Sequence, residues 1–172
     1  MEQKMMDIDS KFDDLLKDLK ESLPKQMPAG CAEVTLKSIL KVLDIEDNLI
    51  NNIMVPLSGG LGGYKSEEGW SGPCGAVVGS CAAIGAILGG KEPMTQEVVM
   101  PTYMKSAQFA KEFEKEFGTV LCPKLSGYDF SDPAAMMEYI KENIWGKKCY
   151  KYVLWAIDNL RKMMSTELKK NW

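Results

Sequence analysis

Hydrophobic residues recur every three or four positions along most of the chain, which is the spacing of one face of an α-helix. The first such stretch covers residues 7–23, where Ile8, Phe12, Leu16 and Leu19 are separated mainly by lysine and aspartate. No convincing run of alternating hydrophobic and polar residues indicates a β-strand. The pattern therefore predicts an all-α fold.

Prolines, glycines and aspartates set the expected limits of the other helices. Asp-Pro pairs are typical of helix N-termini, whereas glycine often follows the last helical residue. Further helices are expected at about residues 31–44, 47–55, 73–90, 101–117, 133–145 and 147–169, with a short helical turn after Cys122-Pro123. We therefore predict a single-domain bundle of six to seven helices.

The longest uncharged stretch, residues 70–90, consists mostly of glycine, alanine, serine and cysteine. Its length could span a bilayer, but it has few of the large apolar residues that drive insertion. Gly75 and Gly79 lie one turn apart, and small residues at this spacing let another helix approach closely. We expect a buried Gly/Ala-rich helix that packs either inside the chain or across a homodimer interface.

The charge balance and the lack of histidine exclude several classes of function. The 172 residues include 21 basic and 24 acidic ones, so binding to nucleic acid or to a membrane surface is not expected. There is no histidine, which excludes Ser-His-Asp and Cys-His catalysis, His-ligated zinc and c-type haem. The N-terminal residues lack the apolar segment of a secretory signal, and we expect a cytoplasmic protein with reduced thiols.

The glycine-rich segment 58–63, Ser-Gly-Gly-Leu-Gly-Gly, predicts a loop with unusual backbone angles or a close approach to another group. It does not fit a nucleotide-binding loop. Lys65 stands where the third glycine of G-x-G-x-x-G would lie, and the P-loop spacing fails as well.

The five cysteines are Cys31, Cys74, Cys81, Cys122 and Cys149, and no two of them form C-x-x-C. All except Cys81 fall at predicted helix N-termini. Free N–H groups and the helix dipole stabilise a thiolate there, and the thiolate is both the nucleophile and the metal ligand. Cys81 lies in a predicted helix interior and is interpreted as a core residue.

These segments carry a resemblance to a known family. The chain resembles the C_GCAxxG_C_C family, which is described as redox-active and named for its cysteine pattern. The resemblance spans about residues 30–160 and rests on Gly30-Cys31-Ala32, 58–63, 72–79, 117–122 and Cys149. It implies a redox role for four cysteines, namely Cys31, Cys74, Cys122 and Cys149.

The resemblance also suggests how the chain is divided. Residues 25–172 are interpreted as the redox-type all-α domain, and residues 1–24 as an N-terminal amphipathic helix that extends it. A similar domain occurs in split-Soret c-type cytochromes. Because this chain has neither C-x-x-C-H nor any histidine, haem does not carry over.

Two redox chemistries use the same four cysteines. If Cys31, Cys74, Cys122 and Cys149 converge, they could hold an iron–sulfur cluster or another thiolate-bound metal for electron transfer. Alternatively they could carry out thiol–disulfide exchange, with Cys31 expected to meet Cys74, and Cys122 to meet Cys149. The sequence alone leaves both chemistries open.

Either chemistry would make the protein an oxidoreductase or an electron-transfer protein. The sequence has no nicotinamide or flavin motif, so a redox partner protein is expected to supply the electrons. The alternative is a non-catalytic helical protein, structural or partner-binding, with inert buried cysteines. Its twelve methionines could provide an adaptable surface, although most lie at positions typical of core filling.

Overall fold

The computed structural model describes residues 2–172, with side chains from residue 8 onward, so residue 1 of the predicted 1–24 extension lies outside it. The described residues form helices and no β-strand, which confirms the all-α prediction. The elements are α1 (Glu2–Ser22), α2 (Cys31–Val42), α3 (Asn48–Met54), η1 (Val55–Leu57), α4 (Ser58–Gly63), α5 (Gly75–Gly89), α6 (Gln96–Phe117), α7 (Cys122–Ser126), α8 (Pro133–Lys141), η2 (Trp145–Cys149), α9 (Tyr150–Met163) and α10 (Ser165–Asn171).

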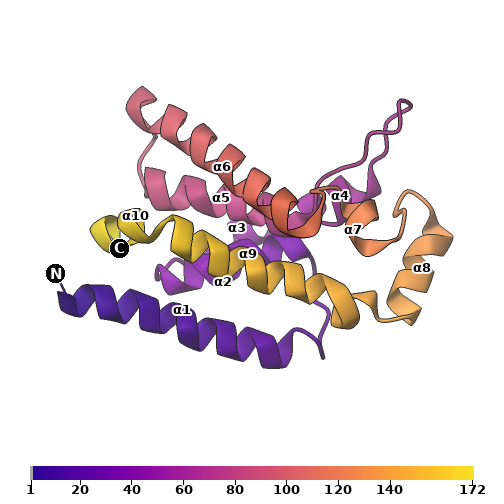
Figure 1. The fold of residues 1–172 in the computed structure, drawn as a ribbon, viewed down its shortest axis with the longest axis horizontal. Coiled ribbons are helices and arrows are strands. Elements are labelled where there is room, and N and C mark those ends of the chain that lie inside the picture. Colours follow the sequence, from indigo (N-terminus) through magenta and orange to yellow (C-terminus); the bar gives the residue numbers. More distant parts are fainter. Residues whose placement is uncertain (1) are drawn as a thin grey trace.

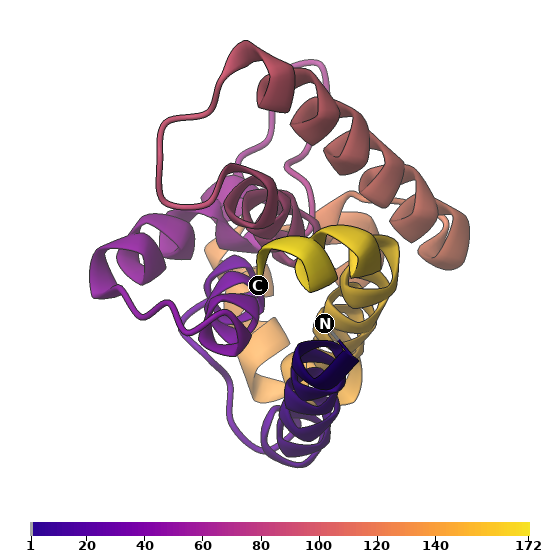
Figure 2. The same ribbon diagram turned by 90° about the vertical axis from the view of Figure 1, so that its left-hand side faces the viewer.

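Helix α5 is the central helix of the bundle. It packs against α2, α6 and α9, while α1 lies along the outer side of α2 and α9 (Figure 1). The view along the bundle shows the same arrangement, with α6 and α1 on opposite sides (Figure 2). Both termini lie at one end of the bundle, and α4, α7 and α8 gather at the other (Figure 1).

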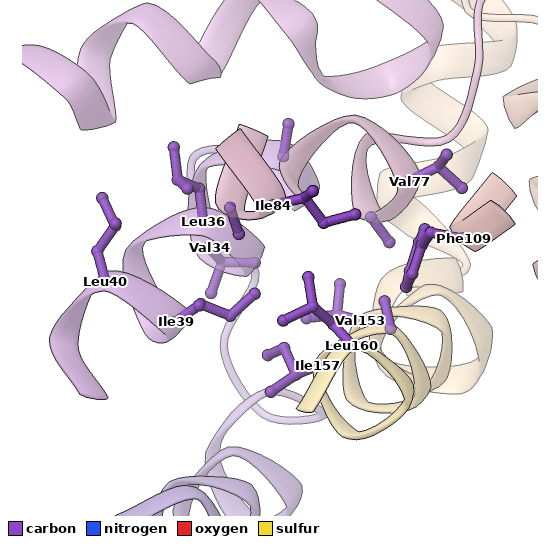
Figure 3. Packing of buried hydrophobic residues seen from close by; sticks show 14 of the residues in the cluster. Val34, Leu36, Ile39, Leu40, Val77, Ile84, Phe109, Val153, Ile157 and Leu160 are labelled. Atoms are coloured by element: carbon purple, nitrogen blue, oxygen red, sulfur yellow. The ribbon is translucent and has the colours of Figure 1, made fainter. Parts of the chain in front are cut away.

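The core lies where α2, α5, α6 and α9 meet. Figure 3 shows Ile39, Ile84, Phe109, Ile157 and Leu160 converging from these four helices, and all five are fully buried. Burying a side chain of this size stabilises the fold by about 1.5–3 kcal/mol relative to leaving it exposed. The core thus fixes the directions of the helices whose ends build the cysteine site.

Glycine allows α2 and α5 to approach closely. A Cβ atom at Gly79 would lie 2.6 Å from the carbonyl oxygen of Ala32 and 2.8 Å from the Cβ of Thr35, closer than real contacts allow. The predicted small-residue packing is therefore found inside the chain, between α5 and α2. No helix in the described part of the chain is long and apolar enough to cross a membrane.

Two helices begin at residues other than the predicted ones. Helix α5 starts at Gly75 rather than at Pro73, because Pro73 forms an isolated β-bridge with Leu121. Helix α6 starts at Gln96 and contains Pro101, which was expected to begin it. Hydrogen bonds from the N–H groups of residues 98 and 99 to the Thr95 carbonyl build a helical turn before the proline.

The predicted C-terminal helices are divided differently. Helix α8 ends at Lys141. Gly146, which lies between the two predicted helices, does not interrupt the helical structure but lies within η2, a π-helical turn that continues into α9. A break at Met164 then separates α9 from α10, so the single predicted helix over 147–169 is wrong. The prediction that most methionines lie at core positions fails at Met104 and Met137, which are 68% and 73% exposed.

Replacing two glycines of α5 tests the close contact with α2. Gly79→Ala should lower the free energy of unfolding by about 1–3 kcal/mol, because the added methyl group overlaps the backbone of α2. Gly85→Ala is the matched control, since its Cβ would meet nothing nearer than the Met94 side chain at 3.7 Å. It should raise the free energy of unfolding by about 0.5–1 kcal/mol through helix propensity. Urea denaturation measures both, and equal effects would contradict the packing.

Candidate functional site

The glycine-rich segment, labelled α4, turns with a left-handed backbone. Gly59, Gly60, Leu61 and Gly62 have φ values of 62°, 73°, 59° and 67°. This conformation costs roughly 1–2 kcal/mol for each residue with a side chain and little for glycine. Because three of the four residues are glycines, the left-handed turn forms at a low conformational energy. The prediction of unusual backbone angles is confirmed.

This left-handed turn is packed against the start of α2 and against α7. The Ser58 hydroxyl accepts a hydrogen bond of 3.0 Å from the Ala32 N–H, in the first turn of α2. A Cβ atom at Gly60 would lie 3.1 Å from both the Cβ of Cys122 and the carbonyl oxygen of Gly72. The turn thus holds the segments that carry Cys31 and Cys122 in place.

Cys31 is the first residue of α2, and its sulfur is surrounded by donors. The largest effect comes from the Cys74 S–H, which donates to it, and further hydrogen bonds come from the N–H groups of Gly59 and Gly75 and the Ser58 hydroxyl. These donors outweigh burial and lower the pKa of Cys31 from 9.0 to about 6. At pH 7 about nine-tenths of such a thiol is thiolate.

Cys74 has the complementary protonation state. It is the N-cap residue of α5 and is buried, with 6% of its surface exposed. Its pKa is raised well above 9.0, first because its S–H donates to Cys31 and then because of burial. The pair therefore consists of one thiolate and one neutral thiol in direct contact.

Cys122 and Cys149 differ from Cys31 in protonation. Burial is the main cause of the raised pKa of Cys122. Burial also raises the pKa of Cys149 to about 11, although the Tyr139 hydroxyl donates a hydrogen bond to the Cys149 sulfur. The predicted lowering of the thiol pKa is found at Cys31, but its donors come from other segments and not from the N–H groups of α2. The prediction is wrong for Cys74, Cys122 and Cys149. Cys122 begins only a five-residue helix, and Cys149 lies inside the continuous helical run of η2 and α9.

A cavity of about 230 Å³ brings these residues together. Cys31, Cys74, Cys122 and Cys149 all line it, as the convergence of four segments requires. Cys81 does not line it, and burial raises the pKa of Cys81, in keeping with the expected packing role. All five cysteines are free thiols in this structure.

The four cysteines do not form a metal-binding group in this arrangement. Among the side chains that the structure describes, no three or more of the Cys, Asp and Glu type are placed so that they could hold a metal ion together. Iron–sulfur clusters bound by protein thiolates need four such ligands around one centre. The side chains as placed therefore do not fit the expected four-thiolate site.

The comparison with protein families matches residues 29–163 to the family described as "Putative redox-active protein (C_GCAxxG_C_C)". The chain belongs to this family. Helix α1 precedes the matched residues, and α10 follows them. The comparisons with curated proteins and with solved structures gave no match.

Four residues that donate hydrogen bonds to the cysteines were not predicted to do so, namely Ser58, Gly59, Gly75 and Tyr139. The glycine-rich segment was recognised as unusual, but nothing in the sequence shows that its N–H and hydroxyl groups face Cys31. Tyr139 lies three residues after Met136 on one face of α8, and both line the cavity. That spacing is a helical signal, yet it does not reveal the hydrogen bond to Cys149.

Removing the Ser58 hydroxyl tests the donor set around Cys31. The rate of Cys31 alkylation should rise with pH through a midpoint near 6, because only the thiolate reacts. Ser58→Ala should move this midpoint up by about one pH unit, since a hydrogen bond to a charged group contributes about 1.5–3 kcal/mol. The lost bond to Ala32 should also lower the free energy of unfolding by about 1 kcal/mol.

Ser22→Ala serves as the control, because the Ser22 hydroxyl donates only to Asp18 within α1. Neither the midpoint nor the stability should change appreciably in this variant. A Ser58→Ala midpoint equal to that of the unaltered protein would remove Ser58 from the donor set.

Proposed function

We propose that this protein carries out thiol–disulfide exchange, with Cys31 as the attacking thiolate and Cys74 as the resolving thiol. The observation that supports this most directly is the hydrogen bond from the Cys74 S–H to the Cys31 sulfur. It combines the two properties that the reaction needs, a thiol that is ionised near neutral pH and a second thiol in contact with it.

The reaction with a disulfide RSSR has two steps. The Cys31 thiolate attacks one sulfur, forming a mixed disulfide and releasing RS⁻. Cys74 then loses its proton to a released thiolate and attacks the Cys31 sulfur, which forms the Cys31–Cys74 disulfide and releases the second RS⁻. In total, RSSR gains two electrons and is reduced, while the two cysteines are oxidised to one disulfide.

The protonation states change in the order that these steps require. While Cys31 is a thiolate, its charge and its hydrogen bond raise the pKa of Cys74, and Cys74 stays neutral. Both effects end when Cys31 enters the mixed disulfide, because its sulfur then carries no charge. The Ala76 N–H, which lowers the Cys74 pKa, then favours the second thiolate, while burial still opposes it.

A redox partner protein is proposed to return the disulfide to the dithiol state. The sequence has no nicotinamide or flavin motif, so a dithiol of the partner is the simplest source of the two electrons. The same exchange chemistry runs in reverse for this step, with the partner's thiolate attacking the Cys31–Cys74 disulfide.

Electron transfer through an iron–sulfur cluster is the second candidate. It is favoured by the placement of all four family cysteines on one cavity. It is opposed by the lack, within the described side chains, of any group that could hold a metal ion. A cluster would require the side chains of Cys122 and Cys149 to take other positions.

Intact-mass analysis of cysteine variants tests the exchange reaction. The reduced protein treated with bis(2-hydroxyethyl) disulfide should lose the mass of two hydrogen atoms, and peptide mapping should locate the link between Cys31 and Cys74. Cys31→Ser should slow the reaction at least about tenfold at pH 7, because the other thiols are mostly protonated. Cys74→Ser should instead accumulate the mixed disulfide on Cys31.

Cys81→Ser is the matched control and should react like the unaltered protein, since Cys81 lies outside the cavity. A first disulfide that joins other cysteines would contradict the proposed roles. An iron–sulfur absorption spectrum of protein purified without oxygen, lost in each of the Cys31, Cys74, Cys122 and Cys149 variants, would favour the second candidate over exchange.

A further inference from the structure

Apart from the reacting Cys31 thiolate, the walls of the cavity carry no charge. None of its lining residues, all of which lie in the described part of the chain, is Asp, Glu, Lys or Arg. Apolar side chains cover much of the wall, and the residues that provide them are Met27, Pro28, Val55, Leu125, Phe130 and Met136. An anionic ligand would find no cationic side chain in this lining, and a cationic ligand would find only the Cys31 thiolate, whose charge is lost when the mixed disulfide forms.

The polar side chains in the wall are already engaged with the protein. The Tyr152 hydroxyl donates to the Leu125 carbonyl at 3.2 Å, and the Trp145 Nε1–H donates to the Leu23 carbonyl at 2.6 Å. The Ser126 hydroxyl bonds to the backbone of Tyr128.

The two remaining hydroxyls serve the cysteines. The Ser58 hydroxyl accepts from the Ala32 N–H, and its hydrogen is shared between the Met54 carbonyl at 3.5 Å and the Cys31 sulfur. The Tyr139 hydroxyl donates to Cys149. A hydrogen-bond acceptor of a ligand would therefore lose its bonds to water and find no free donor among these side chains, which is unfavourable.

The size and the opening of the cavity limit the ligand further. A dry protein cavity of roughly 150 Å³ binds benzene, so a cavity of about 230 Å³ suits a molecule somewhat larger than that. Met27, Ala29 and Gly62 line the cavity and are exposed, which places its opening between the start of α2 and the left-handed turn.

We infer that the disulfide reduced by Cys31 and Cys74 is a small, uncharged, apolar organic disulfide. This inference rests on the proposed exchange reaction and follows the same two steps, with RSSR reduced to RSH and RS⁻ while the two cysteines form a disulfide. The apolar walls of the cavity favour an apolar substituent R. The Cys31 thiolate lies in the same walls, so it can reach a disulfide bound there.

Two probes that differ in charge and share their size test this selectivity. Dipropyl disulfide and cystamine have the same number of non-hydrogen atoms, but cystamine carries two ammonium groups. The rate of Cys31–Cys74 disulfide formation with each is divided by its rate with the thiolate of 2-mercaptoethanol, which removes differences in intrinsic reactivity and in attraction to a thiolate. The corrected rate should be at least about tenfold higher for dipropyl disulfide, because burying an unpaired charge is costly.

A charge placed at the opening gives a second readout. Met27 is 51% exposed, so Met27→Glu should fold normally and should raise the corrected rate with cystamine several-fold relative to dipropyl disulfide. Met94→Glu adds the same charge beside the far end of α5, next to Gly89, and should change neither rate.

The outcomes separate this inference from the function on which it rests. Equal corrected rates for the two probes, or a preference for cystamine, would overturn the apolar substrate while leaving thiol exchange intact. Failure of both probes to form the Cys31–Cys74 disulfide, with bis(2-hydroxyethyl) disulfide also inactive, would overturn the exchange reaction itself.

Discussion

The hydrogen bonds that converge on the Cys31 sulfur are the interaction on which the site depends. Their donors come from the left-handed turn and from the start of α5, two segments that are distant from Cys31 in sequence. Two backbone hydrogen bonds join the segment before α5 to the segment before α7. The Cys74 N–H donates to the Val120 carbonyl at 2.7 Å, and the Cys122 N–H donates to the Gly72 carbonyl at 3.0 Å. A thiolate in a largely apolar cavity is stable only with such donors around it.

The packing of the helices brings these hydrogen-bond donors to the Cys31 sulfur. Gly75 and Gly79 let α5 lie against α2 so closely that a Cβ atom at Gly75 would overlap the Cys31 sulfur. The same close approach puts Cys74, the N-cap residue of α5, beside Cys31. The small-residue packing of α5 is therefore part of the cysteine site as well as of the core.

The sequence predicted the parts of the structure that depend on local patterns. Periodicity predicted the helices, and glycine predicted the unusual turn. Aspartates were expected at helix limits, and Asp47 and Asp132 are the N-cap residues of α3 and α8. The order of the cysteine segments indicated the family. Local patterns could not show that Pro73 pairs with Leu121, because that bridge joins distant segments and moves the start of α5.

The protonation states of the thiols could not be predicted from the sequence, because they too depend on contacts between distant segments. A helix N-terminus favours a thiolate, but burial opposes it, and only the fold shows which effect is larger. At Cys31 the donors prevail, whereas at Cys122 and Cys149 burial prevails.

Ultraviolet absorbance of the thiolate, recorded against pH for the reduced protein and for Cys31→Ser, tests the Cys31 site most directly. The difference between the two titrations should show a single thiolate that forms with a midpoint near pH 6, where an ordinary thiol is protonated. A difference that appears only above about pH 8, the range of an unperturbed cysteine, would contradict a stabilised thiolate at Cys31.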